Sequence, residues 1–411
     1  MRGKVTNYTI FNIALYFFFV FSYISESIPM GNLFIVFSLL LMLAGRIFSS
    51  RSLKISKRDF KLFLWCCIFA IYAYSSRLWA QRASLTVSKS NALIFIVIAM
   101  GIILTCKYEG LSVDDILKVL MYGGYTVGIF VLFRYGFRGI LAALQNEQRL
   151  GQVLNANTLG MCVAYSLLIN FYYLLYGKRF AISDLLIIPT LVILVATGSR
   201  KSIVILIGGV FLLFIIKNYN NKRAIQSLAN IVLIIVLLSI ITFFALKLPA
   251  LSRISSRLKS MIIVLLGGGT RSTDGWLRVQ YVKLGIQLFR QHPVLGIGLG
   301  NANIYTSMYW GHNHYLHNNY VELLATLGIV GTLLYYGIFI YFLKIFWKYR
   351  KTERDKNYDI CIVILILKLI MDYGAVFFYN RETYIFILLF WIETSKLKSG
   401  QHRRMSISNV N

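Results

Sequence analysis

Three histidines stand close together in the second half of the chain, at His312, His314 and His317. An imidazole exchanges protons near neutral pH, so one of them could act as a general base toward a hydroxyl group. The H-x-H-x-x-H spacing also admits a metal site, but carboxylates and cysteines are absent from the run itself. A third interpretation is a set of polar side chains at a membrane interface. The pattern favours a general base and no metal ligands.

Arginines in the same half of the chain could bind an anion. Arg278 lies in the stretch Trp276–Arg290, which we interpret as an amphipathic helix. A polar stripe on this helix ends at Arg290, and Arg278 falls outside it. Ligand binding explains Arg278 better than simple solvation does, although an arginine that snorkels to the interface also fits. Arg271 precedes the helix in a glycine-rich run and is a further candidate.

A second basic turn reads Thr197-Gly198-Ser199-Arg200-Lys201-Ser202 and separates two apolar blocks. A glycine turn, hydroxyl side chains and a helix N-terminus together can form an anion site, and the guanidinium of Arg200 adds bidentate contacts. Arg149, which precedes the apolar block Thr158–Tyr176, is a weaker candidate, with a plain loop charge as its alternative. These arginines indicate an anionic ligand.

The elements that must position these residues are membrane-spanning helices. The chain has 411 residues, of which 58% are hydrophobic and 14% are charged, and its mean hydropathy is +0.67. Apolar blocks of roughly 17 to 22 residues recur, the length that crosses a bilayer as a helix. We therefore expect an all-α polytopic membrane protein of about twelve helices, forming one domain over residues 1–411. The expected helices are Thr9–Ser25, Asn32–Gly45, Phe60–Tyr74, Asn91–Cys106, Ile116–Phe133, Thr158–Tyr176, Ser183–Thr197, Ser202–Ile216, Ala229–Leu246, Asn319–Phe346, Asp359–Phe378 and Thr383–Glu393.

The distribution of lysine and arginine predicts the orientation of the chain. With the N-terminus inside, the densest basic clusters fall in alternate loops and in the C-terminal tail, which places both termini in the cytoplasm and the longest loop, residues 247–318, outside. That large extracytoplasmic loop is itself basic, and an anionic ligand would explain why. The net charge is +28. Its cytoplasmic share is explained by the retention of basic residues on that side and by attraction to anionic lipid headgroups. Nucleic acid is not an expected partner, because no soluble module carries the basic residues.

One pair of ionisable residues lies deep in an apolar block. Lys368 and Asp372 are one helical turn apart and can neutralise each other. A transporter or flippase is the competing class of protein, and it usually places such groups near the middle of the bilayer. The other candidate residues concentrate in external loops, which favours chemistry at the membrane surface.

In combination, these motifs resemble those of the O-antigen ligase and polymerase superfamily. The resemblance rests on Arg278, the run LFRQHPVLGIGLGN over Leu288–Asn301, His317-Asn318 and Gly328-Ile329-Val330-Gly331. The turn Thr197-Gly198-Ser199-Arg200 is similar to the other signature of the superfamily. The resemblance covers the second half of the chain strongly and the first half only by topology.

The resemblance implies a GT-C-like, metal-independent glycosyltransferase without a cofactor, located in the bacterial plasma membrane. Its donor would be a polyprenyl-diphosphate-linked glycan and its acceptor a second glycan. Arg200 and Arg278 would hold the diphosphate, and His317 would be the catalytic base because it alone has both the asparagine and the GxxG motif at the family spacing. The other expected substrate-binding residues are Arg149, Arg271, Arg290, Asn318, His312 and His314.

The run from His317 to Leu324 most resembles members that polymerise O-antigen or capsule repeat units. We therefore expect a polymerase at the outer face of the membrane, with a chain-length regulator and a flippase as protein partners. Ligation of the finished glycan to lipid A core is the alternative within the family. The diphosphate bond would supply the energy, since the sequence contains no ATP-binding motif.

Overall fold

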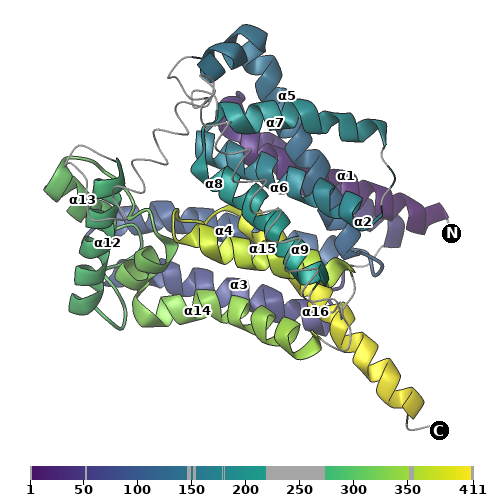
Figure 1. The fold of residues 1–411 in the computed structure, drawn as a ribbon. Coiled ribbons are helices and arrows are strands. Elements are labelled where there is room, and N and C mark those ends of the chain that lie inside the picture. Colours follow the sequence, from purple (N-terminus) through teal and green to yellow (C-terminus); the bar gives the residue numbers. More distant parts are fainter. Residues whose placement is uncertain are drawn as a thin grey trace.

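The computed structural model describes residues 2–50, 53–145, 150, 154–177, 179, 181–218, 274–350 and 356–408. These residues form helices joined by turns, with no β-strand among them, which confirms the expected all-α fold (Figure 1). The helices are α1 (Arg2–Ile24), α2 (Gly31–Ser50), α3 (Lys57–Ser75), α4 (Ala83–Cys106), α5 (Val113–Gln145), α6 (Ala156–Leu175), α7 (Ile187–Ala196), α8 (Arg200–Ile203), α9 (Gly209–Asn218), α12 (Asp274–Gln291), α13 (Ala302–Trp310), α14 (Asn319–Tyr349), α15 (Lys356–Asp372) and α16 (Arg381–Ser408).

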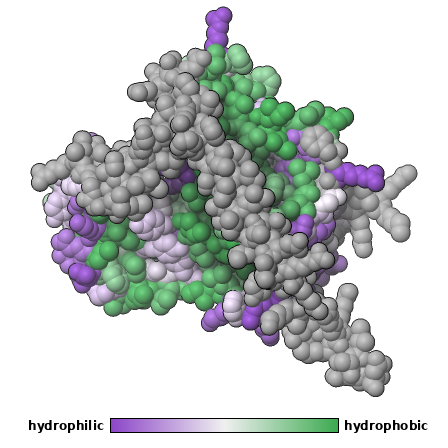
Figure 2. Space-filling model, in the orientation of Figure 1, coloured by the Kyte–Doolittle hydropathy of each residue, from purple (hydrophilic) through white to green (hydrophobic). Residues whose placement is uncertain are grey.

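Six of the described helices, α1, α2, α4, α5, α6 and α14, are long and apolar enough to cross a membrane. Large apolar side chains such as Phe37 and Phe48 of α2 are exposed, as expected of a surface that faces lipid. Figure 2 shows hydrophobic residues across the middle of one face and hydrophilic residues gathered at the end where α12 lies. The chain is thus a multi-pass helical membrane protein. The count of about twelve helices stays a prediction, and Ala229–Leu246 lies outside the described residues.

Helix ends that were predicted on one side of the membrane lie together in the bundle. Tyr8 of α1 donates a hydrogen bond to Asp115 of α5 (2.7 Å). Lys107, just after α4, forms an ion pair with Asp59 of α3 (3.0 Å). Both ends of the described chain lie at this same end, and α12 and α13 lie at the opposite end, which we call the site end (Figure 1). The compartment that each end faces stays a prediction.

The segment around residue 200 combines two unusual helical turns. Ile182–Leu186 forms a 3-10 turn before α7, and Pro189 follows within the first turn of α7, where its missing N–H costs no hydrogen bond. α8 passes through a π-helical turn, Val204–Gly208, into α9. Such turns are frequent near functional sites. The chain therefore enters the bundle at Arg200 as one continuous helix that ends at Asn218.

α14 is broken at Gly328, where φ is 64° and ψ is −167°. The break frees main-chain groups, and the glycine-rich loop after α12 pairs with them. Ile297 donates its N–H to the carbonyl of Ala325 (3.0 Å), and Ile329 donates its N–H to the carbonyl of Pro293 (2.9 Å). The two glycine motifs noted in the sequence therefore dock on each other, which fixes the loop after α12 against α14.

A small separate core holds α12 over the start of α14. Tyr281, Leu284 and Leu288 of α12 are buried against Leu316 and Val321. The apolar stripe predicted for Trp276–Arg290 is therefore covered by protein. The opposite stripe of the helix is exposed. This packing brings one face of α12 next to the segment that carries the histidines.

Candidate active site

The backbone around His317 is constrained from both sides. His317 has a φ of 56°, a left-handed conformation that is uncommon outside glycine. Before it, Leu316 donates its N–H to the buried carboxylate of Glu322 (2.8 Å). After it, the side chain of Asn318 accepts the N–H of Val321 (3.1 Å) and caps α14. These contacts hold a conformation that costs about 1–3 kcal/mol, a form of strain that is concentrated at functional sites.

Aromatic rings surround His317. The Tyr281 ring of α12 stacks on it with centroids 5.7 Å apart, and the Tyr315 ring lies 4.3 Å away. Burial raises the pKa of the Tyr315 phenol, which the nearby charge of Arg278 only partly offsets. Burial also raises the pKa of Tyr281. Both phenols therefore keep their protons at neutral pH, which leaves the imidazole as the group of this cluster suited to accept one.

Arg278 completes this cluster from α12. It lies one helical turn before Tyr281 and is half-buried, and its charge acts on the Tyr315 hydroxyl. No carboxylate among the described residues forms an ion pair with it. A half-buried guanidinium without an acidic partner is suited to an anionic ligand. The structure thus brings Arg278 and His317, which are far apart in the sequence, to one place.

The other predicted residues are less closely integrated. His312 and His314 are exposed, although the His314 ring lies 5.9 Å from that of His317. Arg290 is exposed at the end of α12. Within the part of the chain that the structure describes, no three histidine, cysteine, aspartate or glutamate side chains are grouped to hold a metal ion. Arg149 and Arg271 lie outside the described residues.

The turn before Arg200 is packed tightly against α6. A Cβ atom on Gly160 of α6 would lie 2.2 Å from the hydroxyl of Ser202 and 2.9 Å from the Cβ of Ser199, so only glycine fits there. The Ser199 and Ser202 hydroxyls are buried and have no hydrogen-bond partner among the described residues. Two such hydroxyls at the start of a helix, beside Arg200, form an arrangement suited to an anion.

The segment between α15 and α16 connects this turn to the histidine cluster. The Lys201 ammonium lies 5.9 Å from the centre of the Phe377 ring. Asn319, two residues after His317, accepts the N–H groups of Phe377 (2.8 Å) and Phe378 (3.2 Å) through its side chain. The prediction of a helix over Asp359–Phe378 was wrong at its end, since α15 stops at Asp372. The apolar run continues past the helix because those residues are buried in protein.

The intramembrane pair also belongs to this connection. The Lys368 ammonium lies 2.6 Å from the Asp372 carboxylate, and both side chains are buried, which confirms the predicted pairing. Asp372 also accepts a hydrogen bond from Tyr336 (3.0 Å), whose hydroxyl in turn accepts one from Asn319 (2.8 Å). The pair therefore supports the start of α14 from within the bundle. Neither the sequence pattern nor the spacing of charges indicated Asn319 as its partner.

The fold and the site thus define a multi-pass helical membrane protein with an arginine and histidine site at one end of the bundle. Residues 185–336 match the family model described as O-antigen ligase, so this part of the chain is similar to that family. The matched span contains Arg200, Arg278 and His317. A comparison with curated proteins gave no match.

Proposed function

We propose that this chain is a membrane glycosyltransferase that polymerises polyprenyl-diphosphate-linked oligosaccharide repeat units. The match to the O-antigen ligase family supports an enzyme of the ligase or polymerase type. The observation that carries the proposal is the cluster in which Arg278, which forms no ion pair with a carboxylate among the described residues, lies one turn from a tyrosine stacked on His317. A guanidinium for the diphosphate and an imidazole for the hydroxyl are the two groups that this transfer needs.

In the proposed reaction, a hydroxyl oxygen of the acceptor attacks the anomeric carbon of the donor sugar. A new glycosidic C–O bond forms while the C–O bond to the diphosphate breaks. The hydroxyl proton passes to His317, and the diphosphate leaves with the bonding electron pair on its polyprenyl carrier. Arg278 and Arg200 stabilise the charge that develops on the leaving group. Since both cations are guanidiniums, they can make bidentate contacts with phosphate oxygens.

The tight packing of Ser199 and Ser202 on Gly160 fixes the turn that carries Arg200, which supports its part in this scheme. The proposal needs no cofactor, and we expect transfer to survive exhaustive chelation. Activity that chelation abolishes and a divalent ion restores would instead favour a metal role for the three histidines.

The proposed location is the bacterial plasma membrane, with the site end facing outward and both termini in the cytoplasm. The common grouping of helix ends supports this arrangement. Labelling of intact cells tests it with the variants Gln291→Cys, exposed at the end of α12, and Lys348→Cys, exposed near the end of α14. A membrane-impermeant thiol reagent should label only Gln291→Cys. If only Lys348→Cys is labelled, the orientation is opposite to the proposed one and the candidate site does not lie at the outer face.

Ligation to a lipid A core is the second candidate, because the matching family model carries the ligase description. Gel analysis of surface glycan from a strain that lacks this chain separates the two functions. A single repeat unit on the final anchor indicates a missing polymerase. Full-length chains that remain on the polyprenyl carrier indicate a missing ligase and would contradict our proposal.

A further inference from the structure

A cavity of about 340 Å³ opens at the site end beside the candidate active site. It lies between the end of α1, the first half of α4, the start of α6 and the start of α16. The polar side chains in its wall include Glu26, Asn155, Tyr379, Arg381 and Glu382. Its volume falls in the lower part of the range of about 300–1,000 Å³ that is typical of small-molecule sites. The cavity is therefore large enough for part of a glycan.

Tyr379 connects the cavity to the histidine cluster. The Tyr379 ring lines the cavity, and the Lys89 ammonium lies 5.0 Å from the centre of that ring. Its hydroxyl interacts electrostatically with Glu322 and with Tyr315. The Tyr315 ring is the one that lies 4.3 Å from His317. Two tyrosines, Tyr379 and Tyr315, therefore stand between the cavity and the imidazole of His317.

The cavity also adjoins the Arg200 turn. Thr158 and Leu159 of α6 line it, and the next residue, Gly160, is the one on which Ser199 and Ser202 pack. The turn that carries Arg200 therefore packs on the same end of α6 that contributes to this cavity.

The groups in the wall suit hydroxyl-rich ligands more than anions. Glu26 and Glu382 bring two carboxylates against the single guanidinium of Arg381, and both carboxylate charges act on that guanidinium. No ion pair joins Arg381 to a carboxylate among the described residues. Carboxylates accept hydrogen bonds from hydroxyl groups, whereas a second anion would be repelled by them. A neutral sugar can use both kinds of group at once.

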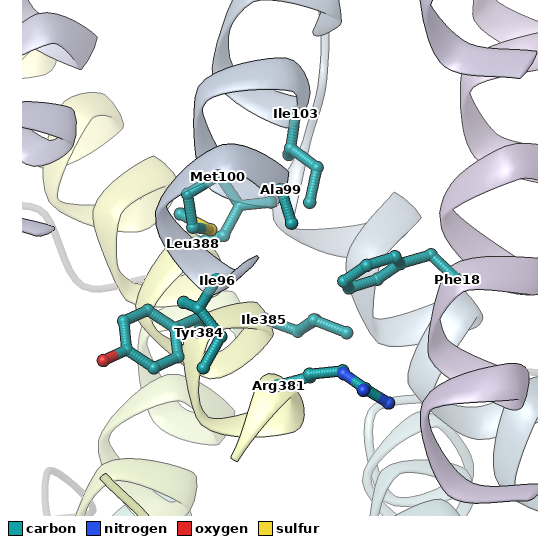
Figure 3. A pocket seen from close by; sticks show the side chains of 9 residues that line it. All are labelled: Phe18, Ile96, Ala99, Met100, Ile103, Arg381, Tyr384, Ile385 and Leu388. Carbon is teal, nitrogen blue, oxygen red and sulfur yellow. The ribbon is translucent and has the colours of Figure 1, made fainter. Parts of the chain in front are cut away.

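The floor of the cavity is apolar. Arg381 extends from the start of α16 toward α1, and deeper in the bundle Phe18, Ile96, Met100 and Leu388 line a crevice between α1, α4 and α16 (Figure 3). A polar ligand cannot move past Arg381 into this crevice without losing its hydrogen bonds. The floor therefore keeps a sugar at the level of Tyr379.

We propose that this cavity binds a sugar of the acceptor glycan next to the residue whose hydroxyl attacks the donor, with Glu26 and Glu382 as hydrogen-bond acceptors for its hydroxyl groups. The inference rests on the proposed function and adds the acceptor subsite to it. The diphosphate of the donor is assigned to the arginines outside the cavity. Mutations in the cavity should therefore change the affinity for the acceptor and leave the affinity for the donor unchanged.

The test uses the full chain in nanodiscs, with polyprenyl-diphosphate glycan extracted from the host strain as donor and a fluorescent lipid-linked repeat unit as acceptor. Glu26→Gln and Glu382→Gln should each raise the KM for the acceptor about tenfold, with the Kd for the donor within about twofold of wild type. The matched control is Glu109→Gln, an exposed glutamate at the opposite end of the bundle, which should leave both constants unchanged.

Ala92→Trp tests the cavity without removing a charge. Ala92 of α4 lines the cavity, and the larger side chain would fill it. It should prevent saturation by the acceptor while donor binding and the unfolding midpoint persist. Wild-type KM in all three cavity variants, or an equal rise in donor Kd, would overturn the acceptor assignment alone. A folded wild-type chain that binds no donor and forms no product would overturn the proposed function, and this inference with it.

Discussion

Gly328 in the break of α14 lies directly against the carbonyl of Val294 in the loop after α12. A Cβ atom at residue 328 would be 2.2 Å from that oxygen, a distance that no side chain tolerates. The contact joins two motifs that are more than thirty residues apart in the sequence. It holds the loop that follows the helix of Arg278 against the helix that follows His317.

Gly328→Ala should therefore loosen this contact and destabilise the protein. The positive φ alone costs a residue with a Cβ about 1–3 kcal/mol, and the backbone clash adds to that. We expect a lower midpoint of thermal unfolding and reduced activity. Gly337→Ala is the matched control on the same helix, because a Cβ there meets no atom within 4 Å. Equal midpoints for the two variants would show that the contact does not constrain the fold.

Asn318 caps α14 through its side chain, and its predicted role in substrate binding stays a prediction. Asn318→Ala should cost about 0.5–2 kcal/mol of stability, measured by chemical or thermal unfolding. Asn318→Ser keeps a capping oxygen, so its stability and activity should stay close to wild type. If Asn318→Ser is stable but inactive, the side chain has a role in substrate binding beyond the cap.

Lys368 and Asp372 should behave as a unit. Lys368→Met leaves a buried carboxylate without its counter-ion, and loss of one partner of a buried pair typically costs about 3–5 kcal/mol. The double variant Lys368→Met/Asp372→Asn removes both charges and keeps an oxygen for Tyr336, so it should recover most of that stability. A double variant as unstable as Lys368→Met would mean that the positive charge itself is required.

Arg278 should need its guanidinium. Arg278→Ala should lower kcat/KM about 10²–10³-fold, as expected when one donor to a developing charge is removed. Arg278→Lys should recover little, because an ammonium cannot reproduce a bidentate phosphate contact. Lys283→Ala, an exposed cation on the same helix, is the control and should be close to wild type. Full activity of Arg278→Lys would show that a positive charge is sufficient at this position and would contradict the need for a guanidinium.

Much of the fold could be predicted because lipid imposes a simple rule on sequence. Blocks of apolar residues of the right length indicated most of the helices, and most of these blocks lie within described helices, although α13 was not predicted. The rule failed at the end of α15. Ala375 and Phe378 there are buried by neighbouring protein, and a hydropathy pattern does not distinguish such residues from residues that face lipid. Hydropathy cannot separate these two kinds of apolar surroundings.

The site was predictable where residue type alone carried the information. Arg278 and His317 stood out as a cation and an imidazole in a region that topology placed outside. Tyr281, Asn319 and Tyr379 were missed as site residues, because their roles depend on contacts with residues far away in the sequence. An asparagine at the start of an apolar helix resembles an ordinary cap, and a tyrosine near the end of a helix resembles an ordinary interfacial residue.

The central claim is that His317 takes the proton of the acceptor hydroxyl while the arginines hold the donor. The most direct measurement is product formation and donor affinity for His317→Ala, His312→Ala and His314→Ala in nanodiscs at matched protein concentration. We predict that His317→Ala loses about 10²- to 10⁴-fold in turnover and keeps its donor affinity, with milder effects for the other two. Near-normal turnover of His317→Ala, together with loss of activity in His312→Ala or His314→Ala, would contradict the assignment.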